Sequence, residues 1–196
     1  MHMEIIFATG NVHKVMEAQK ALGDKITLIM PKELGIVEDI PETGDALEIN
    51  ALQKCQYLWE RFHKPCFADD TGLEVEALNG APGVHTARYA GESKEPAANM
   101  DKLLAELDGV KNRRARFRTA VSYIDNDGIQ HLFEGVLNGS IALEKSGTEG
   151  FGYDPVFIPD GYDGKTLAQI TLEEKNAISH RGKAMRALME YLNHAQ

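Results

Sequence analysis

The first thirty residues pass from a short apolar run through a tight polar turn to an amphipathic segment, and this order constrains the fold most. Residues 3–8 are typical of a short buried strand, and Thr9-Gly10-Asn11 closes it with turn-forming residues. Apolar residues then recur at helical spacing until Gly23, and residues 25–30 resemble a second strand. Strand, helix and strand in this order predict an α/β protein whose sheet is flanked by helices.

The rest of the chain continues the alternation. Helices are predicted at residues 47–62, from Pro96 to Leu107, and from Thr171 onward, where Thr171 and Glu174 form a capping box. Asn126-Asp127-Gly128 predicts a hairpin turn. Further strands are expected at residues 66–68, 73–77, 115–124, 129–143 and 155–159. No repeat and no linker divides the sequence, so a single domain over residues 1–196 is expected.

Composition and charge narrow the class of protein. Hydrophobic residues make up 43% of the 196 residues, as in an ordinary globular domain, and the net charge of −9 disfavours a nucleic acid as partner. The apolar runs are too short to cross a membrane, and the first residues lack the pattern of a signal peptide. Cys55 and Cys66 have no metal-binding spacing and are expected to be buried thiols in a reducing compartment. A cytoplasmic protein is therefore expected.

One basic cluster runs against the acidic composition. It comprises Lys111, Arg113, Arg114, Arg116 and Arg118. A charge run of this kind is usually a solvated strand edge or loop, and it lacks the interleaved stacking aromatics of a nucleic-acid site. We expect it to have no role in binding nucleic acid.

Several enzyme classes lose their support because their motifs are missing. The sequence contains no GxSxG, HExxH or GxxxxGK[ST] motif, and the glycines at 147, 150 and 152 do not follow the dinucleotide-binding order. Four polar segments remain, each expected at a strand end or in a loop, where ligand sites of α/β sheets gather.

Two of these segments suit a phosphate and a metal ion. The turn Thr9-Gly10-Asn11 with Lys14 aims backbone N–H groups and the positive end of a helix at one point, although an ordinary helix cap would look the same. The acidic pair in Asp69-Asp70-Thr71-Gly72 follows a buried strand and suits Mg²⁺, the alternative being an exposed acidic turn. Neighbouring side chains of an extended backbone point to opposite faces, so only one of the two aspartates is expected to meet the metal.

The other two segments lie toward the C-terminus. Phe151-Gly152-Tyr153-Asp154-Pro155 displays two aromatics and an acid, which suits either ligand stacking or core packing with a capping acid. Lys175 and His180 would lie about 140° apart on one continuous helix. A helix break at Ser179 would let them converge, whereas an unbroken surface helix with scattered charges is the alternative.

Together these segments resemble the inosine triphosphate pyrophosphatase family, the Ham1-like non-canonical purine nucleoside triphosphatases. The resemblance covers nearly the whole chain in order and departs from the family pattern at Thr71 and Thr86, where serine is usual, and at Ile49, where Glu is common. It rests on Thr9-Gly10-Asn11-Val12-His13-Lys14, Glu42-Thr43-Gly44, Asn50-Ala51 with Lys54, Ala68-Asp69-Asp70-Thr71-Gly72-Leu73, Gly80-Ala81-Pro82-Gly83, Ala87-Arg88-Tyr89-Ala90-Gly91, Gly150-Phe151-Gly152-Tyr153-Asp154-Pro155, Glu174-Lys175 and Ile178-Ser179-His180-Arg181-Gly182.

The resemblance implies a Mg²⁺-dependent homodimer that hydrolyses dITP, ITP and XTP to the monophosphate and pyrophosphate. It also implies an elongated mixed sheet flanked by helices, with two lobes and a central nucleotide cleft. Asp70 would be the proton acceptor and, with Glu42, a metal ligand. The substrate would be bound by Thr9, Gly10, Asn11, Val12, His13, Lys14, Lys54, Thr71, Phe151, Gly152, Tyr153, Asp154, Lys175, His180 and Arg181.

Two other functions stay open at this point. An acidic pair followed by Thr-Gly after a strand also suits a phosphatase with an aspartyl nucleophile, which would release orthophosphate. A nucleotide-binding module without catalysis would bind the same ligand and leave it intact. The preferred purine and the number of metal ions are not predicted by the sequence.

Overall fold

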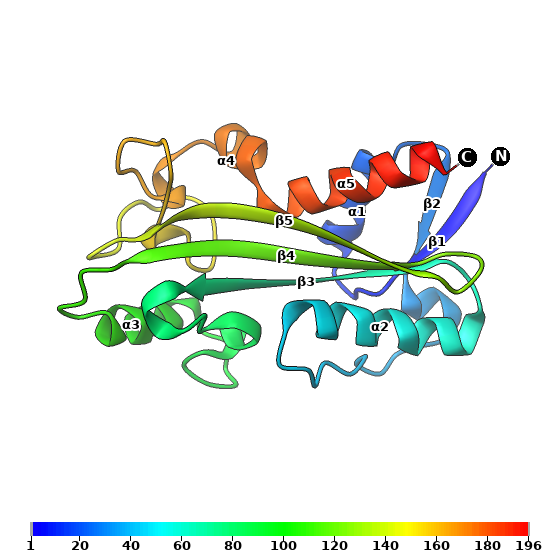
Figure 1. Cartoon of the computed structure of the whole chain (residues 1–196), viewed down its shortest axis with the longest axis horizontal. Helices are drawn as coiled ribbons and strands as arrows, with labels where there is room; N and C mark the ends of the chain where they lie inside the picture. The colour runs from blue at the N-terminus through cyan, green and yellow to red at the C-terminus, as the bar shows by residue number, and fades with distance from the viewer. Residues whose placement is uncertain (1, 196) are drawn as a thin grey trace. The chain divides into compact units, whose positions relative to one another are not determined.

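The computed structural model describes residues 2–195, which form a six-stranded sheet with helices packed on it (Figure 1). The strands lie in the order β2-β1-β3-β4-β5-β6. Both β2 and β3 run parallel to β1, whereas β6 is antiparallel to β5, so the sheet is mixed. The strands are β1 (Met3–Phe7), β2 (Ile26–Ile29), β3 (Cys66–Val75), β4 (Arg114–Ile124), β5 (Gln130–Ile141) and β6 (Phe157–Pro159). The expected α/β fold is confirmed.

The longer helices begin and end at residues that the sequence marks. Asn11 caps α1 and Gly23 follows its end with positive φ, while Pro96 occupies the first position of α3. Thr171 and Glu174 form the expected capping box at the start of α4. The helices are α1 (Val12–Leu22), α2 (Leu47–Phe62), α3 (Pro96–Glu106), α4 (Leu172–Ile178) and α5 (His180–His194). None of the helices described between residues 2 and 195 has the length and apolarity needed to cross a membrane.

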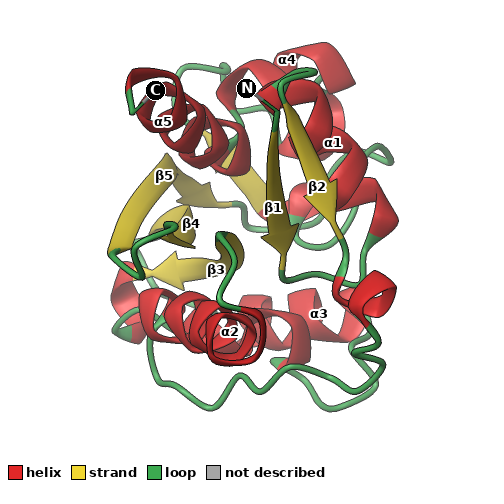
Figure 2. Ribbon diagram, turned by 90° about the vertical axis from the view of Figure 1, so that its right-hand side faces the viewer, coloured by secondary structure: helices red, strands yellow, loops and turns green. Residues whose placement is uncertain are grey.

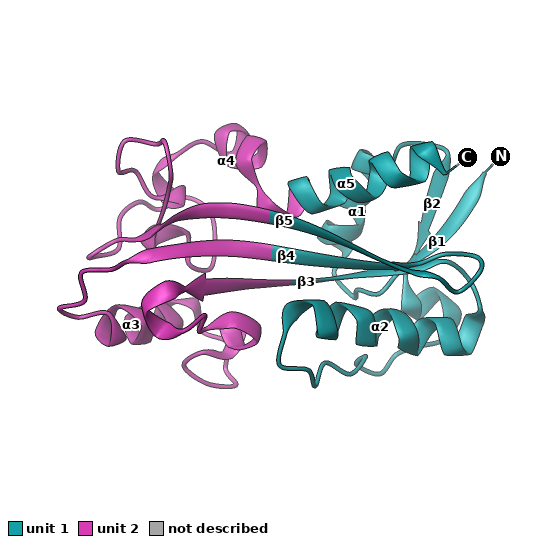
Figure 3. Ribbon diagram, viewed as in Figure 1, with its two compact units in different colours: residues 1–70, 119–135, 183–196 teal, residues 71–118, 136–182 magenta. Residues whose placement is uncertain are grey.

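The chain divides into two compact units (Figure 3). Unit 1 contains the chain up to Asp70, residues 119–135, and the chain from Lys183 onward; unit 2 contains residues 71–118 and 136–182. The chain changes unit inside β3, β4, β5 and α5. The two units therefore share regular elements and are not joined by a loop-like linker.

Unit 1 is a three-layer arrangement in which the sheet is covered on both faces (Figure 2). Side chains alternate along its strands, so Ile5 and Phe7 pack with α1 and α5, whereas Ile6 packs with α2. In β3, Phe67 joins the α1 and α5 side, stacked on Phe7 with 4.2 Å between ring centroids, and Cys66 and Ala68 join the α2 side. This alternation decides where the next two residues of β3, Asp69 and Asp70, point.

Unit 2 has a separate apolar core. Leu73 and Val75 of β3 pack with Leu103 of α3, and Phe117 of β4 packs on Phe157 with 4.6 Å between ring centroids. Tyr153 and Leu167 complete this core from the segment that follows β5. Through Tyr153, the glycine-rich segment before β6 is anchored in the core of unit 2.

The structure corrects one expectation about the sheet. Asp69-Asp70-Thr71-Gly72 was expected at a strand end with a second strand beyond it, but β3 runs without a break from Cys66 to Val75. Pairing of β3 with β1 covers Cys66 and Phe67, and β4 is the neighbouring strand on the other side, so the polar stretch continues a strand that is already part of the sheet. The strand predicted at residues 73–77 also ends earlier, because residues 76–78 form a 3-10 turn.

Candidate active site

The turn between β1 and α1 is built as a helix cap. The Asn11 side chain accepts hydrogen bonds from the backbone N–H groups of His13 and Lys14 at 3.0 and 3.4 Å, and the Asn11 N–H donates to the Thr9 hydroxyl at 3.1 Å. The local cap thus uses the N–H groups of Asn11, His13 and Lys14, which are three of those predicted to bind phosphate. Residues 10–13 are exposed, so the positive end of α1 faces solvent.

The pleat of β3 sends the two aspartates to different partners. Asp69 is 1% exposed, and its carboxylate lies 3.4 Å from the Lys14 ammonium of α1. The Asp70 carboxylate accepts a hydrogen bond from the Asn50 side chain of α2 and lies near Lys54 and Glu42. The prediction that adjacent aspartates point to opposite faces is confirmed.

Lys54 is the buried cation of unit 1. Its ammonium donates to the Asp69 carbonyl oxygen at 2.6 Å and pairs with the Glu42 carboxylate at 2.5 Å. Burial disfavours the charged form, but the negative charges of Asp69, Glu42 and Asp70 outweigh it, so the pKa of Lys54 is raised. Lys54 therefore stays protonated and holds the loop of Glu42 against β3.

Asp70 has a strongly perturbed carboxyl group. Its pKa is raised from 3.8 to about 6, chiefly by burial, and the nearby carboxylates of Glu42 and Asp69 act in the same direction. Lys54 and the Asn50 hydrogen bond act in the opposite direction. The cluster as a whole holds three carboxyl groups and only two ammonium groups, those of Lys14 and Lys54, so its negative charge is not fully neutralised.

This excess of carboxylate oxygen fits a hard divalent cation. Glu42 and Asp70 supply oxygen ligands, which Mg²⁺ prefers, and their mutual repulsion is what a bound cation would relieve. Among residues 2–195, no group of three or more His, Cys, Asp or Glu side chains is placed to hold a metal ion. A magnesium ion here would thus take its remaining ligands from water or from a phosphate.

A second cluster of predicted residues lies in unit 2, around Asp154. The buried Asp154 carboxylate accepts the Phe151 N–H at 3.0 Å and forms a short ion pair with Lys175. The Lys175 ammonium also sits over the Phe151 ring, 4.1 Å from its centroid. Gly150 adopts φ +77°, and a Cβ there would meet the Asp154 carboxylate at 2.1 Å, so only glycine fits.

The two aromatics of this segment have different environments. Phe151 is 73% exposed, although it is large and apolar. Tyr153 is buried in the unit 2 core, and its hydroxyl donates to the Thr86 carbonyl oxygen at 2.6 Å. Core packing with a capping acid therefore describes Tyr153 and Asp154, whereas the Phe151 ring is exposed.

Of the two alternatives that the sequence left open at Ser179, the structure has the helix break, between α4 and α5. Ser179 has extended backbone (φ −54°, ψ 128°) between α4 and α5, and its hydroxyl accepts the Gly182 N–H at 3.3 Å. The break places His180 on the Phe117 ring, with 5.1 Å between ring centroids, and Arg181 beside it at the start of α5. Thr71, the predicted substrate contact of β3, is half-buried.

The basic cluster is engaged within unit 2. Arg113 donates to the carbonyl oxygens of Ile141, Leu107 and Ala142 at 2.7 to 2.8 Å. Arg114 forms a two-pronged ion pair with Asp160, and Arg116 lies 2.8 Å from Glu74. These arginine side chains form hydrogen bonds and ion pairs with carbonyl and carboxylate oxygens of the protein itself.

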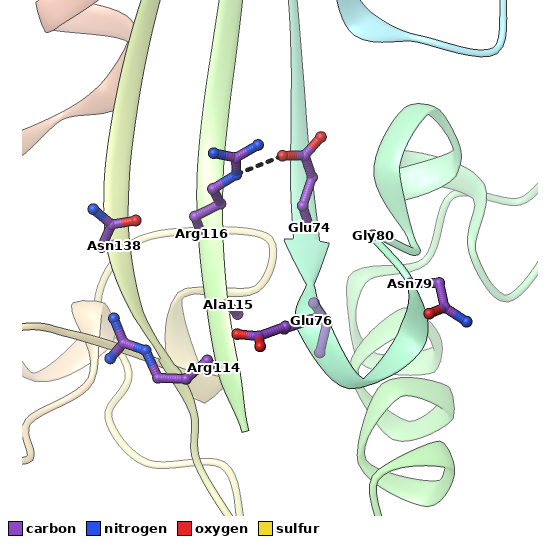
Figure 4. A pocket seen from close by; sticks show the side chains of 9 residues that line it. Glu74, Glu76, Asn79, Gly80, Arg114, Ala115, Arg116 and Asn138 are labelled. Atoms are coloured by element: carbon purple, nitrogen blue, oxygen red, sulfur yellow. Dashed lines mark hydrogen bonds and ion pairs between the residues drawn. The ribbon is translucent and has the colours of Figure 1, made fainter. Parts of the chain in front are cut away.

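A pocket of about 530 Å³ adjoins this cluster (Figure 4). In Figure 4, Arg116 points to Glu74, while Glu76, Asn79 and Asn138 surround the opening. Of the residues described here, those that line the pocket include none of the predicted site residues. The pocket is thus separate from both predicted clusters.

Sequence reasoning did not assign a role to two residues that the structure places in the unit 1 cluster. Asp69 pairs with Lys14, and Asn50 contacts both Asp70 and the Gly44 N–H. Asn50 is 4% exposed. The signal available in the sequence was that Asn50 is a polar residue on the apolar face of a predicted helix, and a buried polar side chain needs hydrogen-bond partners.

The sequence and the fold are both similar to those of known proteins. The model of the Ham1 family matches residues 5–191. A dITP/XTP pyrophosphatase of Flavobacterium psychrophilum is 51% identical over 96% of this chain and 98% of its own, and one of Porphyromonas gingivalis is 50% identical over 96% and 97%. The solved structure of the Staphylococcus aureus Ham1 protein superposes with a TM-score of 0.93 at 40% identity, covering 98% of this chain and all of that one. On these matches, nearly end to end in sequence and in structure, the chain belongs to the Ham1 family.

Proposed function

We propose that this protein hydrolyses non-canonical purine nucleoside triphosphates, of the dITP, ITP and XTP class, to the monophosphate and pyrophosphate. The observation that carries the proposal is the unit 1 cluster, in which Lys14 and Lys54 stand among Glu42, Asp69 and Asp70. Relatives about half identical over nearly their whole length are named dITP/XTP pyrophosphatase, which supports the same reaction.

In this proposal Mg²⁺ is held by Glu42 and Asp70. When bound, it would neutralise charge on the triphosphate. Thr9, Gly10, Asn11, Val12 and His13 would surround the phosphates at the helix N-terminus, with the N–H groups of Gly10 and Val12 as donors because the cap uses those of Asn11, His13 and Lys14. Lys14 and Lys54 would add positive charge.

Asp70 is the proposed proton acceptor for the attacking water. A pKa of about 6 leaves its carboxylate mostly ionised above neutral pH, yet basic enough to take a proton. Asp69 is assigned a different role: it holds the Lys14 ammonium, from the other face of β3.

The base of the nucleotide is assigned to unit 2. Phe151 offers an exposed ring for stacking, and Lys175, which lies over that ring, is fixed by Asp154. Hypoxanthine and xanthine present an acceptor O6 beside a protonated N1, so donors on Lys175, His180 or Arg181 would favour them over adenine. The remaining contacts are assigned to Thr71, Gly152 and Tyr153, the last through its backbone because its ring is buried.

The proposal also covers the assembly and location of the enzyme. It acts as a homodimer in the cytoplasm, where free nucleotides occur and where the two buried cysteines stay reduced. Light scattering at micromolar concentration tests the dimer, for which a mass of twice 21.7 kDa is expected.

The experiment that tests the function is a panel of purified nucleoside triphosphates with MgCl₂, assayed separately for pyrophosphate and for orthophosphate. Pyrophosphate from dITP, ITP and XTP, with ATP and GTP much slower, is expected. Orthophosphate as the first product would indicate instead a phosphatase, and binding of ITP without turnover would indicate a binding module.

A further inference from the structure

One face of α2 holds the loop that carries Glu42. Asn50, Gln53 and Lys54 lie at positions i, i+3 and i+4 of α2 and so share a face. Lys54 pairs with Glu42 at 2.5 Å, Gln53 accepts the Thr43 N–H at 2.8 Å, and Asn50 accepts the Gly44 N–H at 2.7 Å. Three consecutive loop residues are therefore each held by one residue of α2.

Asn50 differs from Gln53 because it also reaches β3. Its side-chain amide is hydrogen-bonded to the Asp70 carboxylate, and the residue is 4% exposed. Gln53 is hydrogen-bonded only to Thr43 among the contacts described for its side chain. Asn50 thus links the Glu42 loop to Asp70.

The orientation of the Asn50 amide follows from its partners. A backbone N–H can only donate, so the Asn50 atom 2.7 Å from the Gly44 nitrogen is the oxygen, and the amide nitrogen is left to donate to Asp70. Gly44 lies close enough that a Cβ there would meet Ile49 Cγ2 at 2.5 Å and Asn50 Oδ1 at 2.9 Å. The Gly44 N–H thus holds the oxygen of the Asn50 amide, and the nitrogen of the same amide donates to the Asp70 carboxylate.

We propose that Asn50 is a positioning residue of the reaction, which fixes the Asp70 carboxylate and ties it to the loop of Glu42. This inference rests on the proposed function of Asp70 as proton acceptor. Without the amide, the carboxylate could rotate, while the loop would still be held by Gln53 and Lys54. Misplacement of a reacting group by about 1 Å can cost on the order of 100-fold in rate.

The kinetic test compares Asn50→Ala with Gln53→Ala, which removes a partner of the same loop and leaves β3 untouched. With dITP and saturating MgCl₂, Asn50→Ala should lower kcat by about 10- to 100-fold with KM changed by less than about 3-fold. Gln53→Ala should keep kcat within about 3-fold. Equal losses in the two variants would mean that Asn50 merely holds the loop, and would overturn the inference.

A near-isosteric variant covers the case in which Asn50→Ala folds poorly. Asn50→Asp keeps an acceptor for the Gly44 N–H and removes the donor to Asp70. At alkaline pH a carboxylate at position 50 has no proton to donate and repels Asp70, so the variant should also lose at least about 10-fold in kcat. A kcat close to that of the parent protein would contradict the proposal.

A double-mutant cycle separates this inference from the proposed function. In urea unfolding without substrate, the changes in unfolding free energy caused by Asn50→Ala and Asp70→Ala should be non-additive, because the two residues share one contact; those of Gln53→Ala and Asp70→Ala should be additive. Additivity for the Asn50 pair would refute the contact. An absence of pyrophosphate release by the parent protein would refute the proposed function, while the unfolding cycle would still decide on the contact.

Discussion

Asp69 and Asp70 are consecutive residues of β3, yet the Asp69 carboxylate lies 3.4 Å from the Lys14 ammonium of α1, while the Asp70 carboxylate accepts a hydrogen bond from Asn50 of α2. The pleat of the strand separates them. Two adjacent carboxylates that would repel each other on one face are thereby given different surroundings, which predict different roles.

The first prediction concerns these two roles. Asp70→Asn should lower kcat with dITP by at least about 100-fold, because it removes the proposed base and a metal ligand together. Asp69→Asn should cost less, since it only weakens the hold on Lys14. Steady-state kinetics with both variants check this, with circular dichroism as the control for folding. Equal losses would mean that both carboxylates serve the metal or the base.

The second prediction follows from the raised pKa of Asp70. Its pKa is about 6 when folded against 3.8 ordinarily, so the stability that this group contributes is complete below pH 3.8 and is lost as the pH rises through about 6. In buffer with EDTA at pH 7.5, the free energy of unfolding of Asp70→Asn should therefore exceed that of the parent protein by on the order of 2 kcal/mol, which urea unfolding measures. The difference should shrink toward zero near pH 4.

Magnesium provides the control for this second prediction. Mg²⁺ should raise the urea midpoint of the parent protein at pH 7.5, because a ligand that binds only the folded state stabilises it, and should do so much less for Asp70→Asn. The prediction is contradicted if the parent protein and the variant unfold alike at both pH values, with and without the metal. That result would show that folding does not raise the pKa of the Asp70 carboxyl group.

The third prediction concerns the exposed ring in unit 2. Phe151→Ala should raise KM for dITP by roughly 5- to 150-fold, since base–aromatic stacking is worth about 1–3 kcal/mol. Its melting temperature should stay unchanged, because the ring is 73% exposed. Tyr153→Phe is the matched control: it leaves the Thr86 carbonyl oxygen without its donor and should lower the melting temperature instead. The reverse pattern would exchange the two assignments.

The fourth prediction separates recognition of the base from recognition of the phosphates. Arg181→Ala should lower the ITP-to-ATP ratio of kcat/KM by roughly 10-fold or more, which corresponds to about 1.4 kcal/mol or more of lost discrimination. Lys14→Ala should slow all triphosphates about equally, because phosphates carry no information about the base. A ratio that stays constant in Arg181→Ala while Lys14→Ala shifts it would invert the assignment.

Local sequence signals predicted most of the helices and strands. Asn11 and Gly23 bound α1, Thr171 and Glu174 open α4, and the break at Ser179 was one of two alternatives that the spacing allowed. These features depend on interactions within a few residues, which a sequence shows directly.

Features that depend on the sheet were harder to predict. Asp69-Asp70-Thr71-Gly72 looks like a turn by composition, yet it lies within the continuous strand β3, whose neighbours in the sheet are β1 and β4. The role of Asn50 was missed for the same reason: its partners, Gly44 and Asp70, meet it only once α2 packs on the sheet. The predicted metal ligands Glu42 and Asp70 are brought together by Lys54, which lies between them in sequence.

The most direct test of the central claim is to follow dITP hydrolysis by the purified protein with MgCl₂ in water enriched in oxygen-18. Attack of water at the α-phosphorus should yield deoxyinosine monophosphate and pyrophosphate in equal amounts, with one labelled oxygen in the monophosphate and none in the pyrophosphate. Release of orthophosphate, or a label carried by the pyrophosphate, would contradict the account.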